Sequence, residues 1–281
     1  IYEDQKKAIG VRVIDSNSKV SQDYFAKVVF VSASTLNTNL ILLNSKSKRF
    51  PNGLGNDNGL LGKFIAFHNY RATINAEFEG FPQYTTEGAK PTSHYIPRFR
   101  NVYRQETDFL RGYAAGFGAQ PNRETNKEGF GAELSNQLLS TKETGVWNVN
   151  SHMMGETIPK ITNQVYLDSE KVDQWGIPLL NIDVDYDEND EKMVKDFFEQ
   201  FEEMFTIAGF KNIKIKDNRK LRNPGNDIHE MGGVRMGNDP KTSLLNKWNQ
   251  LHNCKNVFVS DGACMTSTST QNPSLTFMAI S

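Results

Sequence analysis

The sequence predicts an α/β protein in which two kinds of sheet occur in one chain. Residues 26–31 form a short apolar run typical of a buried parallel strand, and a helical pattern begins directly after it at Thr35. In residues 179–186 apolar side chains alternate with Asn and Asp, which is typical of an antiparallel strand with one solvated face. The two patterns favour a buried parallel sheet near the N-terminus and an antiparallel sheet further along the chain.

Length and charge narrow the class of protein. The 281 residues suffice for one large domain or two modest ones. A formal net charge of -1 gives no basic surface for nucleic acid. No apolar run approaches the roughly 18 residues of a transmembrane helix. The 18 Phe residues support a packed core rather than disorder.

The two cysteines carry little information about chemistry or compartment. Cys254 and Cys264 lack the spacing and the partners of a metal site. They fit either two buried thiols or a disulfide, so both the periplasm and the cytoplasm remain compatible with the sequence.

The N-terminal part is expected to contain two strands, a helix and a loop. Residues 11–14 and 26–31 are expected to be strands, and Thr35 is expected to cap the helix that follows. The apolar side chains of that helix recur at helical spacing: Leu36, Leu40, Ile41 and Leu43. Residues 52–62 are rich in Gly and Asn, which predicts a series of turns.

The middle of the chain predicts a strand pair and a long helix. Residues 165–168 and 179–186 are expected to be strands joined around the turn at residues 175–178. Residues 190–208 are expected to be helical, and Gly209 ends the helix. Its apolar stripe consists of Val194, Phe197, Phe198, Phe201, Met204, Phe205 and Ala208. A Phe- and Met-rich stripe at this spacing indicates core packing rather than cofactor contact.

The C-terminal segment contains the most informative residues. His229 precedes two glycines, Asp261-Gly262 follows a predicted strand at residues 256–260, and Asn272 precedes Pro273. Each pattern has a structural explanation. A lone His beside glycines is commonly a turn or core residue, Asp-Gly is commonly a turn, and Asn-Pro fits an N-cap with proline at the first helical position.

In combination, three C-terminal segments resemble the glucose-methanol-choline (GMC) oxidoreductases, flavoenzymes that oxidise alcohols and sugars. The segments are His229-Glu-Met-Gly-Gly-Val-Arg-Met-Gly, Val257-Phe-Val-Ser-Asp-Gly-Ala and Gln271-Asn-Pro-Ser-Leu-Thr. Residues 155–178 resemble the sugar-oxidising members in particular. The resemblance extends over most of the chain and corresponds to the C-terminal half of the family.

The resemblance implies an FAD cofactor and a division into three segments. Residues 1–62 are expected to form part of a Rossmann-like FAD-binding domain, and residues 226–281 are expected to return to it with the catalytic motifs. Residues 63–225 are expected to form an antiparallel α+β substrate-binding domain. The chain contains no G-x-G-x-x-G turn for the FAD pyrophosphate. It is therefore expected to be a piece of a longer protein, to be inactive alone, and to bind FAD weakly or not at all.

The implied catalytic residues are His229 and Asn272. Histidine suits a general base because its unperturbed pKa is about 6.5, and asparagine both donates and accepts hydrogen bonds without titrating. The implied cofactor-binding residues are Ala33, Asp261, Gly262, Asn272, Pro273 and Thr276. His152 is expected to line the substrate cleft.

The sequence departs from the family at three of these motifs. Ser34 stands where the family has Gly after Ala33, Gly233 stands where it has Thr, and Ala263 stands where it has Ser. The change at Ser34 weakens the expectation of a close backbone approach to the cofactor there.

Other residues leave alternatives open. His68 fits a structural role as well as a functional one, and His94 and His252 are expected on the surface or in loops. Residues 116–120 fit either a wall of the substrate cleft or a turn.

The implied function is FAD-dependent oxidation of a CH–OH group of a sugar or polyol. His229 would act as the base and the flavin would accept the hydride. No motif specifies the electron acceptor. An alternative of a different class is a non-catalytic module that binds a ligand or partner and lacks a functional FAD site. Flavin absorbance of the purified protein separates the two.

Overall fold

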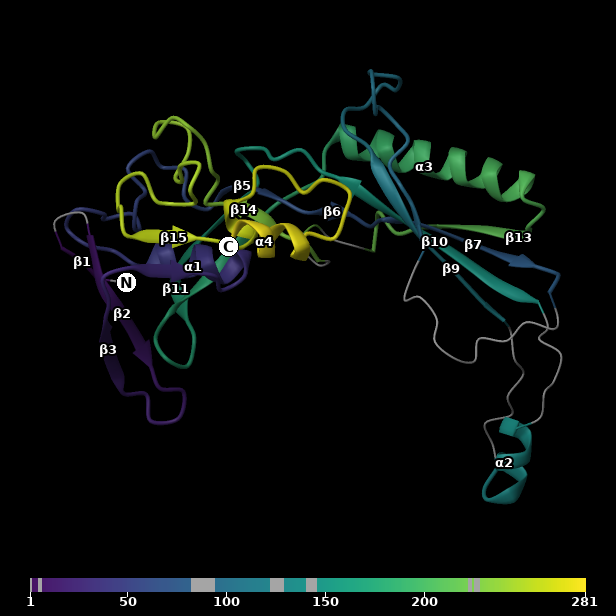
Figure 1. Ribbon diagram of the computed structural model, residues 1–281, viewed down its shortest axis with the longest axis horizontal. Helices are drawn as coiled ribbons and strands as arrows, with labels where there is room; N and C mark the ends of the chain where they lie inside the picture. Colours follow the sequence, from purple (N-terminus) through teal and green to yellow (C-terminus); the bar gives the residue numbers. More distant parts are fainter. Residues whose placement is uncertain are drawn as a thin grey trace. The chain divides into compact units, whose positions relative to one another are not determined.

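A computed structural model describes residues 2–4, 7–81, 94–121, 129–139, 146–221, 224 and 228–281. Contacts between Cα atoms divide the chain into two compact units, whose elements are labelled in Figure 1. Unit 1 comprises Ile1–His68, Glu156–Asp187 and Asn223–Ser281, and unit 2 comprises Asn69–Gly155 and Glu188–Arg222. The units differ from the expected segments mainly because Glu156–Asp187 joins the chain ends. The expected boundary between residues 225 and 226 lies outside the described residues.

The two ends of the chain meet in a parallel strand pair. Strand β4 (Val29–Val31) pairs with β15 (Val257–Val259), with Val29 opposite Val257. The strand expected at residues 26–31 thus lies beside the strand expected at residues 256–260. The four valines of the pair are buried, whereas Phe30 and Phe258 stack on its other face with ring centroids 5.2 Å apart. Phe30 remains 66% exposed, so apolar surface on this face of the pair is open.

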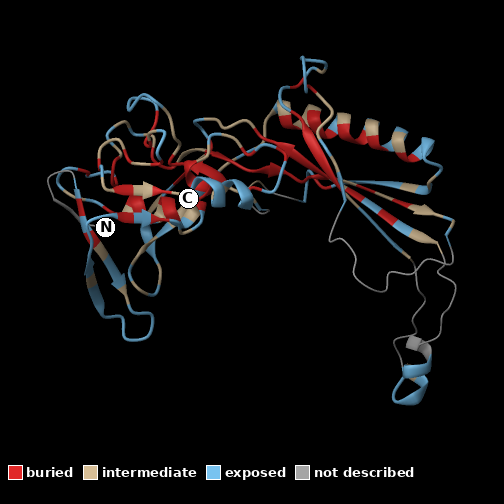
Figure 2. Ribbon diagram, viewed as in Figure 1, coloured by how far each residue is buried: buried red, intermediate tan, exposed pale blue. Residues whose placement is uncertain are grey.

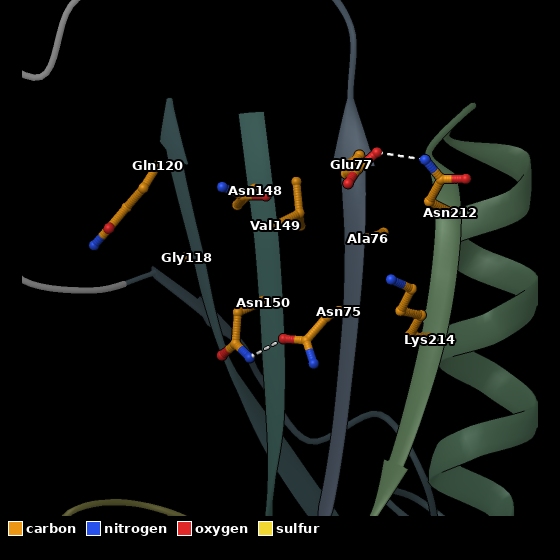
Figure 3. A pocket seen from close by; sticks show the side chains of 10 residues that line it. All are labelled: Asn75, Ala76, Glu77, Gly118, Gln120, Asn148, Val149, Asn150, Asn212 and Lys214. Atoms are coloured by element: carbon orange, nitrogen blue, oxygen red, sulfur yellow. Dashed lines mark hydrogen bonds between the residues drawn. The ribbon is translucent and has the colours of Figure 1, made fainter. Parts of the chain in front are cut away.

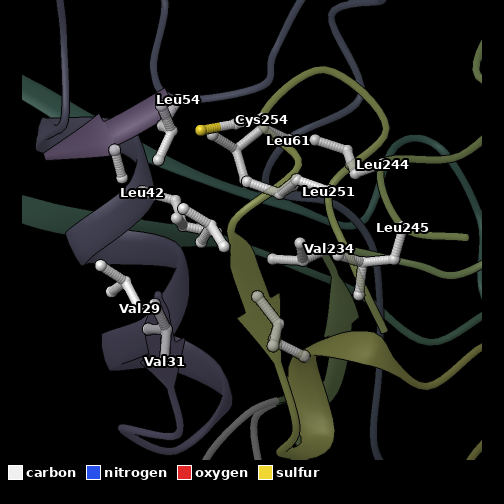
Figure 4. Close-up of a cluster of buried hydrophobic side chains, with 14 of the residues drawn as sticks. Val29, Val31, Leu42, Leu54, Leu61, Val234, Leu244, Leu245, Leu251 and Cys254 are labelled. Carbon is white, nitrogen blue, oxygen red and sulfur yellow. The ribbon is translucent and has the colours of Figure 1, made fainter. Parts of the chain in front are cut away.

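One apolar core holds unit 1 together. Side chains from α1, β4 and the C-terminal segment point toward one another in Figure 4. The fully buried members include Leu42, Leu54, Val234, Leu245 and Cys254. Cys254 and Cys264 are both buried free thiols, so the disulfide alternative is wrong.

Helix α1 (Thr35–Asn44) begins differently from the prediction. Ser34, not Thr35, occupies the N-cap position, and it makes no side-chain capping hydrogen bond. Thr35 turns inward and donates its hydroxyl hydrogen to the Glu230 carbonyl at 2.6 Å. The predicted apolar stripe is also wrong in part, because Thr35, Thr38 and Asn39 are buried while Ile41 is 36% exposed. Each of the three buried polar side chains donates a hydrogen bond to the C-terminal segment, whereas Oδ1 of Asn39 is buried without a hydrogen-bond partner among the described residues.

Unit 1 also contains an antiparallel sheet in the order β12-β11-β5-β14. Its strands are β5 (Lys63–Ala66), β11 (Gln164–Val172), β12 (Pro178–Asp183) and β14 (Met231–Gly233). The predicted strand pair around residues 175–178 is confirmed as β11 and β12. Of the alternating residues, Val184 and Tyr186 pack beside Phe67, but Ile182 is 47% exposed. The pairing of β11 with β5 explains why this hairpin belongs to unit 1.

The remaining elements of unit 1 are short. Strands β1 (Tyr2–Asp4), β2 (Lys7–Ile14) and β3 (Ser21–Phe25) form an antiparallel sheet, so the strand expected at residues 11–14 begins earlier. The C-terminal segment adds the 3-10 turn η1 (Gly262–Cys264) and the helix α4 (Ser274–Ile280).

Unit 2 is an antiparallel sheet with a helix across one face. The sheet has the order β13-β7-β10-β9-β8, and β6 (His68–Asn69) pairs with β10. Its strands are β7 (Ala72–Phe78), β8 (His94–Ile96), β9 (Tyr113–Pro121), β10 (Trp147–Glu156) and β13 (Lys211–Asp217). A further helix is α2 (Ala132–Leu139), and its residues 132–136 are mostly exposed.

Helix α3 (Glu188–Ile207) provides a large part of the core of unit 2. Its buried side faces the strands in Figure 2. Phe197, Phe201 and Phe205 are at most 1% exposed and pack with Ile74 and Met153 of the sheet. The predicted stripe is therefore confirmed as core packing, except for Ala208, which is exposed and follows the end of the helix. The helix ends before Gly209, which has a φ of 79°.

Within the described part of the chain, no helix combines the length and apolarity needed to cross a membrane.

Candidate active site

The two histidines His68 and His229 meet in unit 1. Their Nδ1 atoms lie 3.0 Å apart, and their rings are nearly perpendicular, at 81°. His68 is fully buried, and its Nε2 lies 3.2 Å from the Thr268 carbonyl oxygen and 3.0 Å from the Ser269 carbonyl oxygen. His229 precedes β14 with a φ of 69°, a strained conformation that places its ring at a defined position.

The partners of His68 define the protonation of both rings. Carbonyl oxygens only accept hydrogen bonds, so Nε2 of His68 must carry a hydrogen. Burial and the charge of His229 lower the pKa of His68 to about 4, so His68 is neutral near pH 7 and its Nδ1 is an acceptor. His229 must then donate from Nδ1, and its Nε2 carries the lone pair. This is the tautomer that a general base acting through Nε2 requires.

The segment that holds His68 is itself anchored. Ser267 donates its hydroxyl hydrogen to the buried carboxylate of Glu156, and Thr268 is 2% exposed. Ser269 has a φ of 54°, which directs its carbonyl toward His68. Asn272 follows three residues later in the same segment.

Sequence reasoning missed the role of this anchored segment and left that of His68 open. The hydrogen-bonded pair His68 and His229 is separated by 161 positions, and His68 and Ser269 by 201. The spacing of residues along the chain cannot predict contacts between residues so far apart in the sequence. The one signal was a histidine directly after the apolar run of residues 64–67, since a buried polar ring needs hydrogen-bond partners.

The glycine pair after His229 fits against helix α1. A Cβ on Gly233 would lie 2.2 Å from Oδ1 of Asn39, and Gly233 has a φ of 87°. Asn39 donates from Nδ2 to the Gly232 carbonyl at 3.1 Å. Asn39 therefore fills the space that the threonine of the family would need, which gives a physical reason for Gly-Gly in this chain.

Ala33, Asp261 and Gly262 gather at the carboxyl ends of the parallel strands β4 and β15. Thr38 donates to Oδ2 of Asp261 at 2.5 Å and accepts from the Ala33 backbone N–H at 3.1 Å. The other oxygen of Asp261 accepts from the Ala263 backbone N–H at 2.9 Å. The carboxylate is thus used inside the protein, so a ligand at this edge would be contacted by backbone rather than by this side chain.

The same edge fits a nucleotide cofactor. In α/β sheets, ligands bind outside the carboxyl ends of the parallel strands. Ser32 and Ser260 place their hydroxyl groups there, 2.8 Å apart and exposed. Gly262 allows the chain to pass close to Thr35, because a Cβ would lie 2.3 Å from Thr35 Oγ1. Thr35 in turn binds Glu230, the neighbour of His229, so this edge is tied to the histidine pair.

The Asn272 segment differs from its prediction. Pro273 occupies the N-cap position of α4, and no side-chain capping hydrogen bond is made. The expected N-cap role of Asn272 is therefore wrong. Its role in catalysis or in cofactor binding stays a prediction. Asn272 and Thr276 are exposed. Helix α4 packs near η1, since the Phe277 ring lies 3.3 Å from the position of a Cβ on Gly262.

His152 belongs to unit 2, unlike the other predicted site residues. Its ring lies over Gly116, where a Cβ would approach to 2.2 Å, and 5.9 Å from the Tyr70 ring. Residues 116–120 are part of β9, so the turn alternative for them is wrong. Of the other histidines, His94 is exposed in β8, and His252 is half-buried beside Ser243.

Residues 159–281 match the C-terminal family model described as GMC oxidoreductase. The match confirms the family resemblance noted in the sequence for this part of the chain.

Curated relatives extend the match over the whole chain. The 2-methyl-1,2-propanediol dehydrogenase of Mycolicibacterium austroafricanum is 32% identical over 298 residues, covering 100% of this chain and 51% of the relative. The fructose dehydrogenase large subunit of Gluconobacter japonicus is 26% identical, covering 94% and 47%. Paromamine 6'-oxidase of Streptomyces fradiae is 25% identical, covering 99% and 48%. The chain thus spans about half the length of the curated relatives it matches.

A solved structure supports the fold. Pyridoxine 4-oxidase from Mesorbium loti matches with a TM-score of 0.55 and 14% identity, covering 99% of this chain and 54% of that chain. At this identity the likeness shows only the fold, a mixed α/β arrangement with antiparallel sheets.

Proposed function

We propose that the full-length protein oxidises an alcohol group of a sugar or polyol with FAD, and that His229 is the base. The names of the three relatives describe dehydrogenases or oxidases, one of a diol and one of fructose. The observation that carries the role of His229 is its hydrogen bond to His68, because this bond leaves the lone pair on Nε2.

The chemistry requires two transfers from the alcohol. FAD, when bound, accepts the hydride from carbon. Nε2 of His229 accepts the hydroxyl proton, and the imidazolium that forms keeps its Nδ1–H bond to His68. A neutral acceptor suits this step because a second positive charge 3.0 Å away would oppose proton uptake. The lowered pKa of His68 supports this arrangement.

Asn272 is proposed to hold the alcohol in line for these transfers. An amide accepts from the hydroxyl and donates to its oxygen without changing charge between pH 5 and 8. Its segment is anchored by His68 through Thr268 and Ser269, four and three positions earlier. His152 is proposed to contact the substrate.

Residues 1–62 and 226–281 are proposed to supply part of the FAD-binding domain. Ala33, Asp261 and Gly262 would contact the cofactor through backbone at the carboxyl edge of β4 and β15. Pro273 and Thr276 would contribute from the start of α4. The open apolar face at Phe30 supports a parallel sheet that has further cover in the full-length protein, since parallel sheets are buried on both faces. Residues 63–225 are proposed to bind the substrate.

Flavin absorbance and its bleaching test this function. Full-length protein is expected to be yellow, and anaerobic addition of a sugar or polyol substrate should bleach the band near 450 nm, roughly as in other flavin enzymes. A panel of pentoses, hexoses and polyols covers the proposed substrate class. A colourless protein that acquires no flavin from added FAD would contradict the proposal and favour the non-catalytic binding module.

A further inference from the structure

A pocket of about 580 Å³ lies on the face of the unit 2 sheet that α3 does not cover. Figure 3 shows side chains from four neighbouring strands around it. Five of these side chains are amides: Asn75, Asn148, Asn150, Gln120 and Asn212. Gly118 forms part of the floor, and no atom lies within 4 Å of the position of its Cβ, so the sheet is hollowed there.

The fold gives no reason for amides at these positions. Asn is depleted in strands, where solvated faces normally carry Thr and other β-formers. Asn150 lies directly opposite Asn75 on β7 and Gly118 on β9. Asn148 lies opposite Glu77 and Gln120 in the same way. Amides at directly opposed positions on adjoining strands therefore indicate a binding role.

Two internal hydrogen bonds orient part of the pocket. Nδ2 of Asn150 donates to Oδ1 of Asn75 at 2.7 Å, and Nδ2 of Asn212 donates to the carboxylate of Glu77. Figure 3 marks both bonds. They leave donor capacity on Asn75 and acceptor capacity on Asn150. Asn148, Gln120 and Lys214 form no side-chain hydrogen bond or ion pair with the part of the chain that the structure describes.

The mixture of donors and acceptors selects the class of ligand. An anion would be matched by donors alone, and a hard cation by oxygen acceptors alone. A hydroxyl group donates one hydrogen bond and accepts two, so a cluster of hydroxyls needs both. The amides of the pocket supply both hydrogen-bond donors and hydrogen-bond acceptors. The negative charge of Glu77 and the positive charge of Lys214 balance each other.

We propose that this pocket is a binding subsite for a saccharide unit. Asn148 and Asn150 lie on the same face of β10 as His152, four and two residues from it, which is about 13 and 7 Å along the strand. The subsite would therefore hold one unit of a larger glycoside, next to the part of the substrate that contacts His152. That last assignment rests on the proposed function, whereas saccharide binding itself does not.

Titration of the full-length protein with maltose tests the subsite. Asn148→Val and Gln120→Val each remove one amide that has no internal partner and replace it with a good strand former. Each is expected to weaken maltose binding, measured by calorimetry, about 3- to 10-fold, the usual worth of one or two hydrogen bonds. Gln22→Val is the matched control, because Gln22 is an exposed amide on β3 of unit 1. It should leave the affinity unchanged.

The outcomes separate this proposal from the catalytic one. Unchanged maltose affinity in both pocket variants, with wild-type circular dichroism, overturns the subsite. Displacement of maltose by inorganic phosphate also overturns it, because the pocket would then be an anion site. Maltose binding that depends on Asn148 in a protein that oxidises neither sugars nor polyols supports the subsite and refutes the proposed function. In an active enzyme, Asn148→Val should raise the KM for a disaccharide substrate about 3- to 10-fold and leave that for a monosaccharide unchanged.

Discussion

At the scale of single residues, the candidate site depends on one hydrogen bond between two rings. His229→Ala in the full-length protein should slow flavin reduction by alcohol about 10²–10⁴-fold, the usual worth of a positioned general base. The flavin content should stay close to that of the wild type, because the lost ring is expected to face the substrate. Anaerobic stopped-flow absorbance measures the rate. Reduction at wild-type speed would remove His229 from the mechanism.

His68 is proposed as a positioning residue that acts through His229. His68→Leu removes the Nδ1 acceptor, so the protonated form of His229 loses a partner and becomes less stable. The acid limb of the pH profile of flavin reduction should then move to lower pH, and the limiting rate should fall about 10-fold or more. His68→Gln keeps a hydrogen-bond donor and a hydrogen-bond acceptor at this position. It should therefore restore part of the limiting rate and part of the position of the acid limb.

The pH profile distinguishes positioning from a structural role. Because the pKa of His68 is lowered to about 4, its own protonation affects the wild-type profile only near or below that pH. A purely structural defect in His68→Leu would lower the rate and leave the acid limb in place. That result, together with no recovery in His68→Gln, would contradict the proposed role.

Asn272 can be tested without the stability effect that an N-cap would bring. The cap of α4 is Pro273, so Asn272→Asp should leave the free energy of unfolding within about 0.5 kcal/mol of the wild type. The new carboxylate should nevertheless slow flavin reduction, because it brings negative charge beside a flavin that must accept a hydride. Urea unfolding and stopped-flow reduction measure the two effects. A variant that folds and reacts like the wild type would exclude Asn272 from the site.

At the scale of elements, Ser34 and Gly233 differ from the residues expected from the family, which are Gly and Thr. Ser34 has φ 72° and ψ 150° at the start of α1, a region that costs a residue with a Cβ about 1–3 kcal/mol. Ser34→Gly should therefore raise the free energy of unfolding by about 1 kcal/mol, after the added flexibility of the unfolded chain is subtracted. The glycine that the family has at this position would thus suit the backbone conformation that Ser34 adopts here.

The opposite change is expected at Gly233. Gly233→Thr restores the family residue but would place its Cβ 2.2 Å from Asn39, at a φ of 87°. It should destabilise the protein by several kcal/mol, roughly the cost of overpacking plus backbone strain. Thermal unfolding of both variants measures whether Ser34→Gly raises stability and whether Gly233→Thr lowers it. Stabilisation by Gly233→Thr would show that Asn39 does not determine the residue at position 233.

At the scale of the whole molecule, the proposed cofactor edge at β4 and β15 comes with no G-x-G-x-x-G turn in residues 1–281. Residues 1–281 alone should bind FAD weakly or not at all, because no Gly-rich turn and helix start supplies charge-assisted contacts to the pyrophosphate. Titration of FAD followed by flavin fluorescence measures the affinity. The full-length protein is the control. Tight stoichiometric binding by residues 1–281 would refute this expectation.

The sequence by itself determined the elements whose pattern is local. The stripe of α3 repeats at helical spacing, and the apolar runs of β4 and β15 are continuous, so each element was found. The expected burial of the first strand was wrong in part, because Phe30 is 66% exposed. The C-terminal motifs also identified the family, because their residues are contiguous in the chain. The start of α1 was wrong by one residue, since the inward turn of Thr35 depends on Glu230, which lies 195 positions away.

Only the tertiary structure decided the partners of the candidate site. It brought His68 to His229, used the carboxylate of Asp261 internally, and placed Pro273 rather than Asn272 at the start of α4. It also gathered amides from four strands into one pocket. The physical reason is the same in each case. A propensity or a period reports what a residue does with its sequence neighbours, whereas buried polar groups take whichever partner the packed chain brings within hydrogen-bond distance.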